Sequence, residues 1–171
     1  MLRPPGMTDA PPARRMRGRR SSLVLGVLVL TAVVSTRWVR LNLSPSVPRG
    51  LYGLVAISTP LARGTLVVLP VPAAVRPWHA SWVPLLKPVA AVAGERVCVD
   101  DEGLWVAGVP YGRVAVEADG HALPRMQGCH QLAEGDVFLA SAHPRSLDGR
   151  YFGPTAIATL TARATPLLLW R

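Results

Sequence analysis

An uncharged stretch that directly follows a cluster of arginines is the feature that most constrains this chain. It runs from Ser21 to Thr36 and contains the apolar segment LVLGVLVLTAVV. Its 16 residues approach the ~20 that a helix needs to cross a bilayer. Trp38 and Val39 extend it beyond Arg37, whose long side chain can reach the membrane interface. We therefore predict a transmembrane anchor over residues 21–39.

The arginines set the orientation of this anchor. Residues 1–20 hold six arginines and one acid, a net charge of +5. Basic flanks stay in the cytoplasm, so residues 1–20 are expected to be a cytosolic tail. Everything beyond the anchor is expected on the outer, periplasmic face of the inner membrane, and the tail is expected to contact membrane lipid. A cleaved signal peptide is the alternative, but STRWVR follows the apolar run in place of an Ala-x-Ala site.

The remainder of the chain predicts an all-β, mainly antiparallel domain. Prolines (17) and glycines (15) are many and no long amphipathic helices alternate with strand-like segments, which disfavours a mixed α/β fold. Residues 70–84, with four prolines and two tryptophans, predict a loop or a short helix. The predicted strands are Tyr52–Ile57, Thr65–Leu69, Arg96–Val99, Leu104–Val106, Val137–Ala140 and Ala156–Leu160. Arg96–Val99 and Leu104–Val106 are expected to form a hairpin across an acidic turn that ends in Gly103.

Charge and ligand patterns exclude several classes of partner. Outside the basic tail the net charge is only +4, without basic residues interleaved with aromatics, so nucleic acid is not an expected partner. The four histidines show no HxxxH pattern and the two cysteines no CxxC pattern, so neither a metal nor another cofactor is predicted.

A serine and a lysine are the candidate catalytic groups. Ser46 lies in NLSPSVPRGLY, where Pro45 and Pro48 restrict the backbone on both sides of it. The sequence has no GxSxG elbow, and the order and spacing of its His and Asp residues match no catalytic triad, so no histidine base is indicated. Lys87 is the only lysine in the chain and lies in the apolar run VPLLKPVAAVAG. To act as a base near neutral pH, its pKa would have to fall by ~3 units from ~10.4, which requires burial.

Three blocks in this order carry a family resemblance: NLSPSVPRGLY, LLKPVAAVAGERV and LAEGDVFLASAHPRSLDGRYFGP. Behind a cytoplasm-facing anchor, they resemble the serine/lysine type I signal peptidases, most closely the TraF-type branch that serves conjugative transfer. The resemblance covers roughly Asn42 to Leu169. It implies a signal-peptidase-like β domain over residues 42–171, exported behind the anchor.

The resemblance implies roles for four side chains. Ser46 would be the nucleophile, and Lys87 would be its general base and then the general acid toward the leaving amine. Ser44 would offer its hydroxyl to the oxyanion beside the backbone N–H of Ser46. Ser146 would orient the lysine amine by a hydrogen bond.

Three further positions match structural features of the family. Asp148 and Arg150 would form an ion pair near the site, and in the TraF branch the matching aspartate also has a direct role in activity. Gly153 would allow the lysine strand to pack closely against the backbone.

The sequence also departs from the general family pattern. Val47 replaces a methionine, Pro88 replaces the arginine that commonly follows the lysine, and SAHPR replaces a GDNRDN run. The last departure leaves the role of His143 open, and we expect it in a solvated loop.

The implied activity is removal of leader peptides from exported precursor proteins, with small residues preferred at −1 and −3. In the TraF branch the partner would include a pilin precursor, and an acyl-enzyme at Ser46 would also permit cyclisation by an attacking amine. The alternative is a catalytically silent, membrane-tethered β scaffold of a secretion or transfer apparatus. A self-cleaving repressor would need a DNA-binding module, for which residues 1–40 are too short and too apolar.

Two cysteines remain, Cys98 and Cys129. In an exported domain they are expected to form a disulfide, worth about 3–4 kcal/mol for a loop of this size. The alternative is a pair of buried thiols.

Overall fold

The computed structural model describes residues 38–118 and 120–170. The predicted cytosolic tail and most of the predicted anchor therefore lie outside the described residues. Of the anchor's last residues, Val39 is already the first residue of a β-strand. In the part of the chain that is described, no helix has the length and apolar character needed to cross a membrane.

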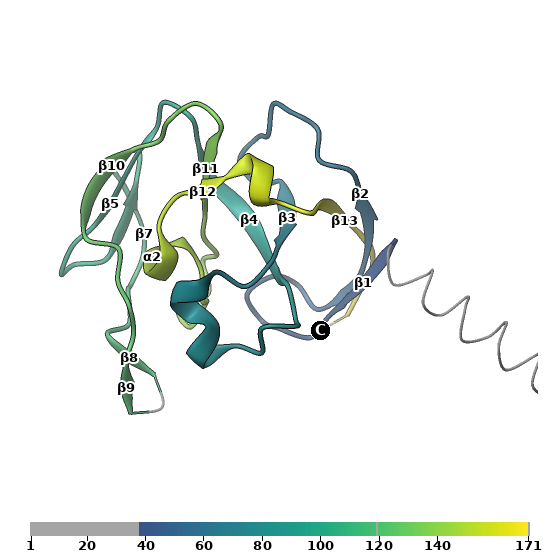
Figure 1. Cartoon of the computed structure of the whole chain (residues 1–171), viewed down its shortest axis with the longest axis horizontal. Helices are drawn as coiled ribbons and strands as arrows, with labels where there is room; N and C mark the ends of the chain where they lie inside the picture. The colour runs from purple at the N-terminus through teal and green to yellow at the C-terminus, as the bar shows by residue number, and fades with distance from the viewer. Residues whose placement is uncertain (1–37, 119, 171) are drawn as a thin grey trace, which may run out of the picture. The chain divides into compact units, whose positions relative to one another are not determined.

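A seven-stranded antiparallel sheet forms the larger part of the domain (Figure 1). Its strands lie in the order β1-β2-β13-β3-β4-β11-β12. Their bounds are Val39–Asn42 (β1), Gly50–Val55 (β2), Leu66–Leu69 (β3), Leu85–Val92 (β4), Asp136–Leu139 (β11), Thr155–Ala156 (β12) and Ala162–Leu169 (β13). The predicted antiparallel, all-β fold class is confirmed.

A second, four-stranded sheet is built from the segment between β4 and β11, with strand order β10-β5-β6-β7. The predicted hairpin is confirmed here, because Arg96–Val99 pairs with Leu104–Val106 across a turn that ends in Gly103. A two-stranded ribbon, β8 and β9, lies between β7 and β10 in the chain. The bounds are Arg96–Val99 (β5), Leu104–Val106 (β6), Val109–Gly112 (β7), Glu117–Ala118 (β8), His121–Ala122 (β9) and Gly128–Gln131 (β10).

Helical structure in the described residues is limited to three short pieces: η1 (Ala73–Trp78), α2 (Gly149–Phe152) and η2 (Ile157–Thr159). The short helix expected within residues 70–84 is η1. The strand predicted over Ala156–Leu160 is wrong, since most of it is η2. β12 lies at the edge of the sheet and β13 lies between β2 and β3, so the chain must leave the edge and cannot continue as a strand beside β11.

Strand β4 joins the apolar core of the domain. Its side chains enter all three clusters of buried apolar residues: Leu85 and Val89 in the first, Ala90 and Ala91 in the second and Leu86 in the third. β4 pairs with β3 and β11, which places it inside the sheet. A polar side chain on this strand therefore points into tightly packed surroundings and has little access to water.

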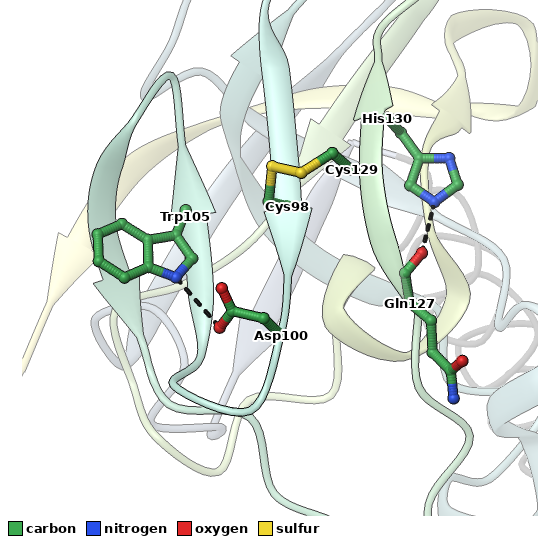
Figure 2. The surroundings of a disulfide bond; sticks show 6 residues. All are labelled: Cys98, Asp100, Trp105, Gln127, Cys129 and His130. Carbon is green, nitrogen blue, oxygen red and sulfur yellow. Dashed lines mark hydrogen bonds between the residues drawn. A yellow bond between two sulfur atoms is a disulfide. The ribbon is translucent and has the colours of Figure 1, made fainter.

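A disulfide fixes the edge of the smaller sheet (Figure 2). Cys98 on β5 and Cys129 on β10 lie directly opposite each other and their sulfurs are bonded. In the adjacent turn, Asp100 accepts hydrogen bonds from the indole N–H of Trp105 (3.2 Å) and from the backbone N–H of Gly103 (3.0 Å). The bridge and the turn together constrain the hairpin that leaves β4.

The predicted close packing at Gly153 is wrong, whereas Gly149, in the same segment, is crowded. A Cβ built on Gly153 would meet nothing within 4 Å, and this glycine instead provides the positive φ of +79° that ends α2. A Cβ on Gly149 would lie 2.8 Å from the carbonyl oxygen of Leu139 and 2.8 Å from the ring of Phe138. The start of α2 can therefore approach β11 only because residue 149 has no side chain.

We predict that Gly149→Ala destabilises the domain by about 1–3 kcal/mol, because the added methyl group meets the backbone of β11. Gly112→Ala is the matched control, since its Cβ would find only the Arg150 guanidinium at 3.7 Å, an ordinary contact. The measurement is chemical denaturation of the full chain in detergent micelles. Equal midpoints for the two variants would contradict the proposed close approach.

Candidate active site

The turn between β1 and β2 presents Ser46. Pro45 and Ser46 form the turn, and the flanking prolines are exposed. Ser46 itself is only 9% exposed. The Ser46 side chain therefore faces the protein and not open solvent. This agrees with a serine whose backbone is restricted by a proline on each side.

Asn42, at the end of β1, stabilises this turn through hydrogen bonds of its side chain. Its side-chain amide donates to the carbonyl oxygens of Ser44 (2.9 Å), Pro48 (3.1 Å) and Val47 (3.2 Å). Its side-chain oxygen accepts the Ser44 N–H at 3.3 Å. Asn42 is 7% exposed, so these bonds satisfy a buried amide that would otherwise be costly. Sequence reasoning missed this residue, although an asparagine directly before a turn is a recognised signal for such bonding.

Three further contacts fix the turn. Val47 is buried in the third apolar cluster beside Tyr52 and Leu86. The Tyr52 hydroxyl donates to the carbonyl of Pro48 at 2.5 Å. The Ser141 hydroxyl donates to the carbonyl of Ser46. Val47, which stands where the general family has methionine, thus anchors the turn in the core.

Lys87 reaches Ser46 from β4. Its Nζ lies 3.0 Å from Ser46 Oγ and 2.9 Å from Ser146 Oγ. The lysine is 4% exposed, and it is paired opposite Val67 within the sheet. The structure thus brings together Ser46, Lys87 and Ser146, three of the residues that the sequence indicated.

Burial lowers the pKa of Lys87 to about 8, whereas the nearby carboxylate of Asp148 raises it and Arg150 lowers it further. Burial dominates because removing an ammonium from water disfavours the charged form. A considerable fraction of the amine is therefore neutral at mildly alkaline pH. A neutral amine has the lone pair that a general base needs.

Ser44 lies on the other side of Ser46. The two hydroxyl oxygens are 2.9 Å apart, and the Ser46 N–H donates to Ser44 Oγ at 3.3 Å. A hydroxyl and a backbone N–H thus converge beside the nucleophile. Both groups can donate to an oxygen that carries developing negative charge.

Asp148 and Arg150 form a fully buried ion pair, with 3.6 Å between Arg150 Nε and Asp148 Oδ1. Asp148 also accepts the backbone N–H of Ser141 at 3.0 Å, and Arg150 donates to the carbonyls of Ser141 and His143. Burial raises the pKa of Asp148, while Arg150 and a hydrogen bond from Ser146 lower it. The pair therefore braces the segment that carries Ser141 and Ser146.

A cleft of about 460 Å³ opens over these groups. Its walls include Ser44, Ser46, Lys87 and Ser146, together with His143. His143 lies in the loop between β11 and α2, where it is half-buried, lines the cleft and accepts the Arg145 N–H through Nδ1 at 3.2 Å. Among the residues that the structure describes, no three His, Cys, Asp or Glu side chains gather as metal ligands.

This geometry suits acyl transfer. A hydroxyl lies within hydrogen-bonding distance of a buried amine of lowered pKa, and two donors lie beside it. Such an arrangement activates a serine without a histidine.

Several known proteins are similar to this chain in sequence. The family model described as "Signal peptidase, peptidase S26" matches residues 19–170. A conjugal transfer protein TraF of Agrobacterium tumefaciens is 36% identical, over 89% of this chain and 97% of its own length. A probable conjugal transfer protein TraF of Sinorhizobium fredii is 32% identical, over 92% of this chain and 94% of its own.

Among solved structures, a signal peptidase I of Enterococcus faecalis covers 64% of this chain and all of its own, with 19% identity and a TM-score of 0.40. The family assignment rests on the sequence matches, which span nearly the whole chain. The chain belongs to the signal peptidase family, peptidase S26, in the branch of the TraF conjugal transfer proteins.

Proposed function

We propose that this protein is a membrane-anchored serine endopeptidase that removes leader peptides from exported precursors, with Ser46 as nucleophile and Lys87 as general base. The observation that carries the proposal is the 3.0 Å separation between Lys87 Nζ and Ser46 Oγ, in a setting that lowers the lysine pKa to about 8. Family membership supports a signal-peptidase-type function on independent grounds.

The chemistry proceeds in two stages. The neutral Lys87 amine takes the Ser46 hydroxyl proton while Oγ attacks the scissile carbonyl carbon. The Ser44 hydroxyl and the Ser46 N–H donate to the resulting oxyanion. The Lys87 ammonium then protonates the leaving amine and the peptide bond breaks, leaving an acyl-enzyme. Lys87, again neutral, deprotonates the water that releases the acyl group, and Ser46 recovers its proton.

The edge of β4 offers a place for the precursor backbone. Residues Leu85–Pro88 pair with β3 on one side. On the other side the β11 ladder ends at the pair Leu139–Val89, with one further bond from Ala140 to the Pro88 carbonyl. Leu85, Leu86 and Lys87 line the cleft on this side. An extended peptide would add to this strand edge and bring its carbonyl to Ser46.

An exposed apolar surface near the nucleophile turn supports placement of the domain at the outer membrane face. Leu41 on β1 and Leu43 beside the turn are exposed. Leu167 and Leu168 are exposed on β13, whose last residues pair with the start of β2. Exposed apolar side chains on neighbouring strands are typical of membrane or protein contact. We propose that this surface contacts the bilayer.

The TraF relatives suggest which precursor is cut. Both curated relatives carry conjugal transfer in their names, and we propose a pilin-type precursor of conjugative transfer as the substrate. The acyl-enzyme permits either hydrolysis or attack by an amine of the same chain, which would yield a cyclic product.

We predict that Ser46→Ala and Lys87→Met both abolish leader cleavage. The assay is processing of a tagged prepilin, and of an ordinary Ala-x-Ala preprotein, by the full-length protein in membranes. Lys87→Met removes the base and also the cost of burying an ammonium, so its stability near pH 7 should equal or exceed that of the wild type. Cleavage by either variant would refute the assigned dyad. A wild-type protein that cuts neither precursor would favour the scaffold alternative.

The rate should also follow the protonation of Lys87. Because the neutral amine is the active form, kcat/KM is expected to rise with pH through an apparent pKa of about 8 and to level off above it. The measurement is a pH–rate profile of the membrane-inserted enzyme on one precursor. A profile that is flat between pH 6 and 9, or that falls with rising pH, would contradict a lysine base.

Asn42 is predicted to position the nucleophile. Asn42→Ala leaves the carbonyls of Ser44, Val47 and Pro48 without their donor and should reduce kcat by on the order of 10-fold, while the apparent pKa of the profile stays near 8. Thr161→Val is the matched control, because it removes a side-chain bond to the carbonyl of Val68, away from the cleft. Equal effects of the two variants would show that Asn42 contributes stability alone.

A further inference from the structure

The walls of the catalytic cleft carry positive charge and no described acid. Apart from Lys87, the charged side chains in these walls are two arginines, Arg40 and Arg145. Within residues 38–118 and 120–170, no aspartate or glutamate lines this cleft. A neutral peptide with small side chains gives no reason for this one-sided charge. The cleft therefore has an electrostatic preference that leader cleavage alone does not explain.

Arg40 is the strongest element of this preference. It lies on β1 opposite Tyr52, is half-buried, and donates one hydrogen bond to the carbonyl of Pro84. Its burial lowers the pKa of the guanidinium without an opposing carboxylate. The ion pairs found among the described residues are Arg63–Glu95, Arg125–Asp101 and Arg150–Asp148, and none of them includes Arg40.

Among the described residues, the hydrogen-bond acceptor of the half-buried Arg40 guanidinium is the carbonyl of Pro84, and no carboxylate is paired with it. Arginine has five N–H donors in a fork that matches a carboxylate. Partial burial of Arg40 costs solvation free energy, and no acid within residues 38–118 and 120–170 offsets this cost. A carboxylate brought by the bound peptide would supply the missing partner.

Arg145 adds a second cation from a different segment. It lies between β11 and α2, next to Ser146, and its side chain is exposed. It lines the catalytic cleft and also the neighbouring cavity of about 320 Å³ that contains Leu123 and Tyr151. The positive charge therefore comes from both the β1 side and the Ser146 side of the site.

The distance between Arg40 and the scissile bond of a bound peptide can be estimated along β4. The carbonyl of Pro84, which Arg40 contacts, comes three residues before Lys87 in the chain. Three residues of extended strand span roughly 10 Å. A peptide added along this edge would thus bring a group about three residues from its scissile bond to the Arg40 guanidinium.

We infer that the cleft selects precursors that carry a carboxylate about three residues from the cleaved bond, with Arg40 as its direct partner and Arg145 as a second cation. The carboxylate comes from an Asp or Glu side chain or from the precursor's own C-terminus. The inference rests on the proposed function and names a specificity determinant for it.

The test uses the full-length protein in detergent micelles and a neutral synthetic peptide with small residues flanking its cleavage site. A single glutamate is placed in turn at each position outside the small residues that flank the cleavage site. Each of these peptides is compared with the peptide that has glutamine at the same position. All these peptides are amidated at the C-terminus. A separate arm compares free and amidated C-termini close to the cleavage site, which distinguishes a side-chain from a terminal carboxylate.

The expected result is a Glu/Gln ratio of kcat/KM of on the order of 10 at one position near the cleaved bond, since hydrogen bonds to charged groups are among the stronger ones. If the carboxylate is the C-terminus itself, only the ratio of kcat/KM between the free and the amidated peptide shows this preference. In Arg40→Gln the ratio should fall toward one, and in Arg40→Glu it should favour a lysine peptide. Arg96→Gln, which removes an exposed arginine on β5 outside the cleft, should keep the wild-type ratio.

The outcomes separate the inference from the proposed function. If the wild type cleaves the peptides with equal kcat/KM for Glu and Gln at every position, and for free and amidated termini, the inference is wrong and the peptidase proposal stands. If a preference exists but survives in both Arg40→Gln and Arg145→Gln, the assignment to this cleft is overturned. If the wild type cleaves neither the peptides nor any precursor, the proposed function fails.

Discussion

The burial of one amine is the constraint on which the rest of this structure depends. Lys87 is 4% exposed and lies between Ser46 and Ser146, and its pKa is about 8. Relative to the ordinary value of 10.5, this shift costs roughly 3 kcal/mol of folding stability whenever the amine is charged. The cost is fully present below pH 8 and disappears as the pH rises toward 10.5. The domain must therefore be stabilised elsewhere to keep its base buried.

The stabilising structure surrounds the amine on three sides. β4 carries Lys87 and shares its other side chains among three apolar clusters. On one side Asn42 and Val47 fix the turn that bears Ser46. On the other, the Asp148–Arg150 pair fixes the segment that bears Ser146. Each brace leaves a serine hydroxyl within 3.0 Å of the same nitrogen, and for Ser46 this is the positioning that acyl transfer requires.

The candidate site was predictable where its residues are unusual in the sequence. Lys87 is the only lysine and lies in an apolar run, and Ser46 is flanked by prolines, so residue chemistry and the family resemblance indicated both. Asn42 was not recognised, because its role depends on three carbonyls that only the folded turn brings together. The cationic character of the cleft was missed for the same reason, since Arg40 and Arg145 are more than 100 residues apart.

The fold was predictable in class but not in every element. Local patterns sufficed for the hairpin of β5 and β6. They failed for Ala156–Leu160, whose strand-like composition is overridden by the crossing from the sheet edge to β13. They also misplaced the crowded glycine, because the contact of Gly149 with Leu139 is set by the packing of α2 on β11.

The central claim is that Lys87 is neutral when it acts, and it can be measured directly. Because this is the only lysine in the chain, selective isotope labelling of lysine gives a single side-chain signal in the NMR spectrum of the micelle-bound protein. Its chemical shift is followed as a function of pH. The account predicts a titration midpoint of about 8. A midpoint near the ordinary value of 10.5 would show that the amine is charged at working pH and would contradict the account.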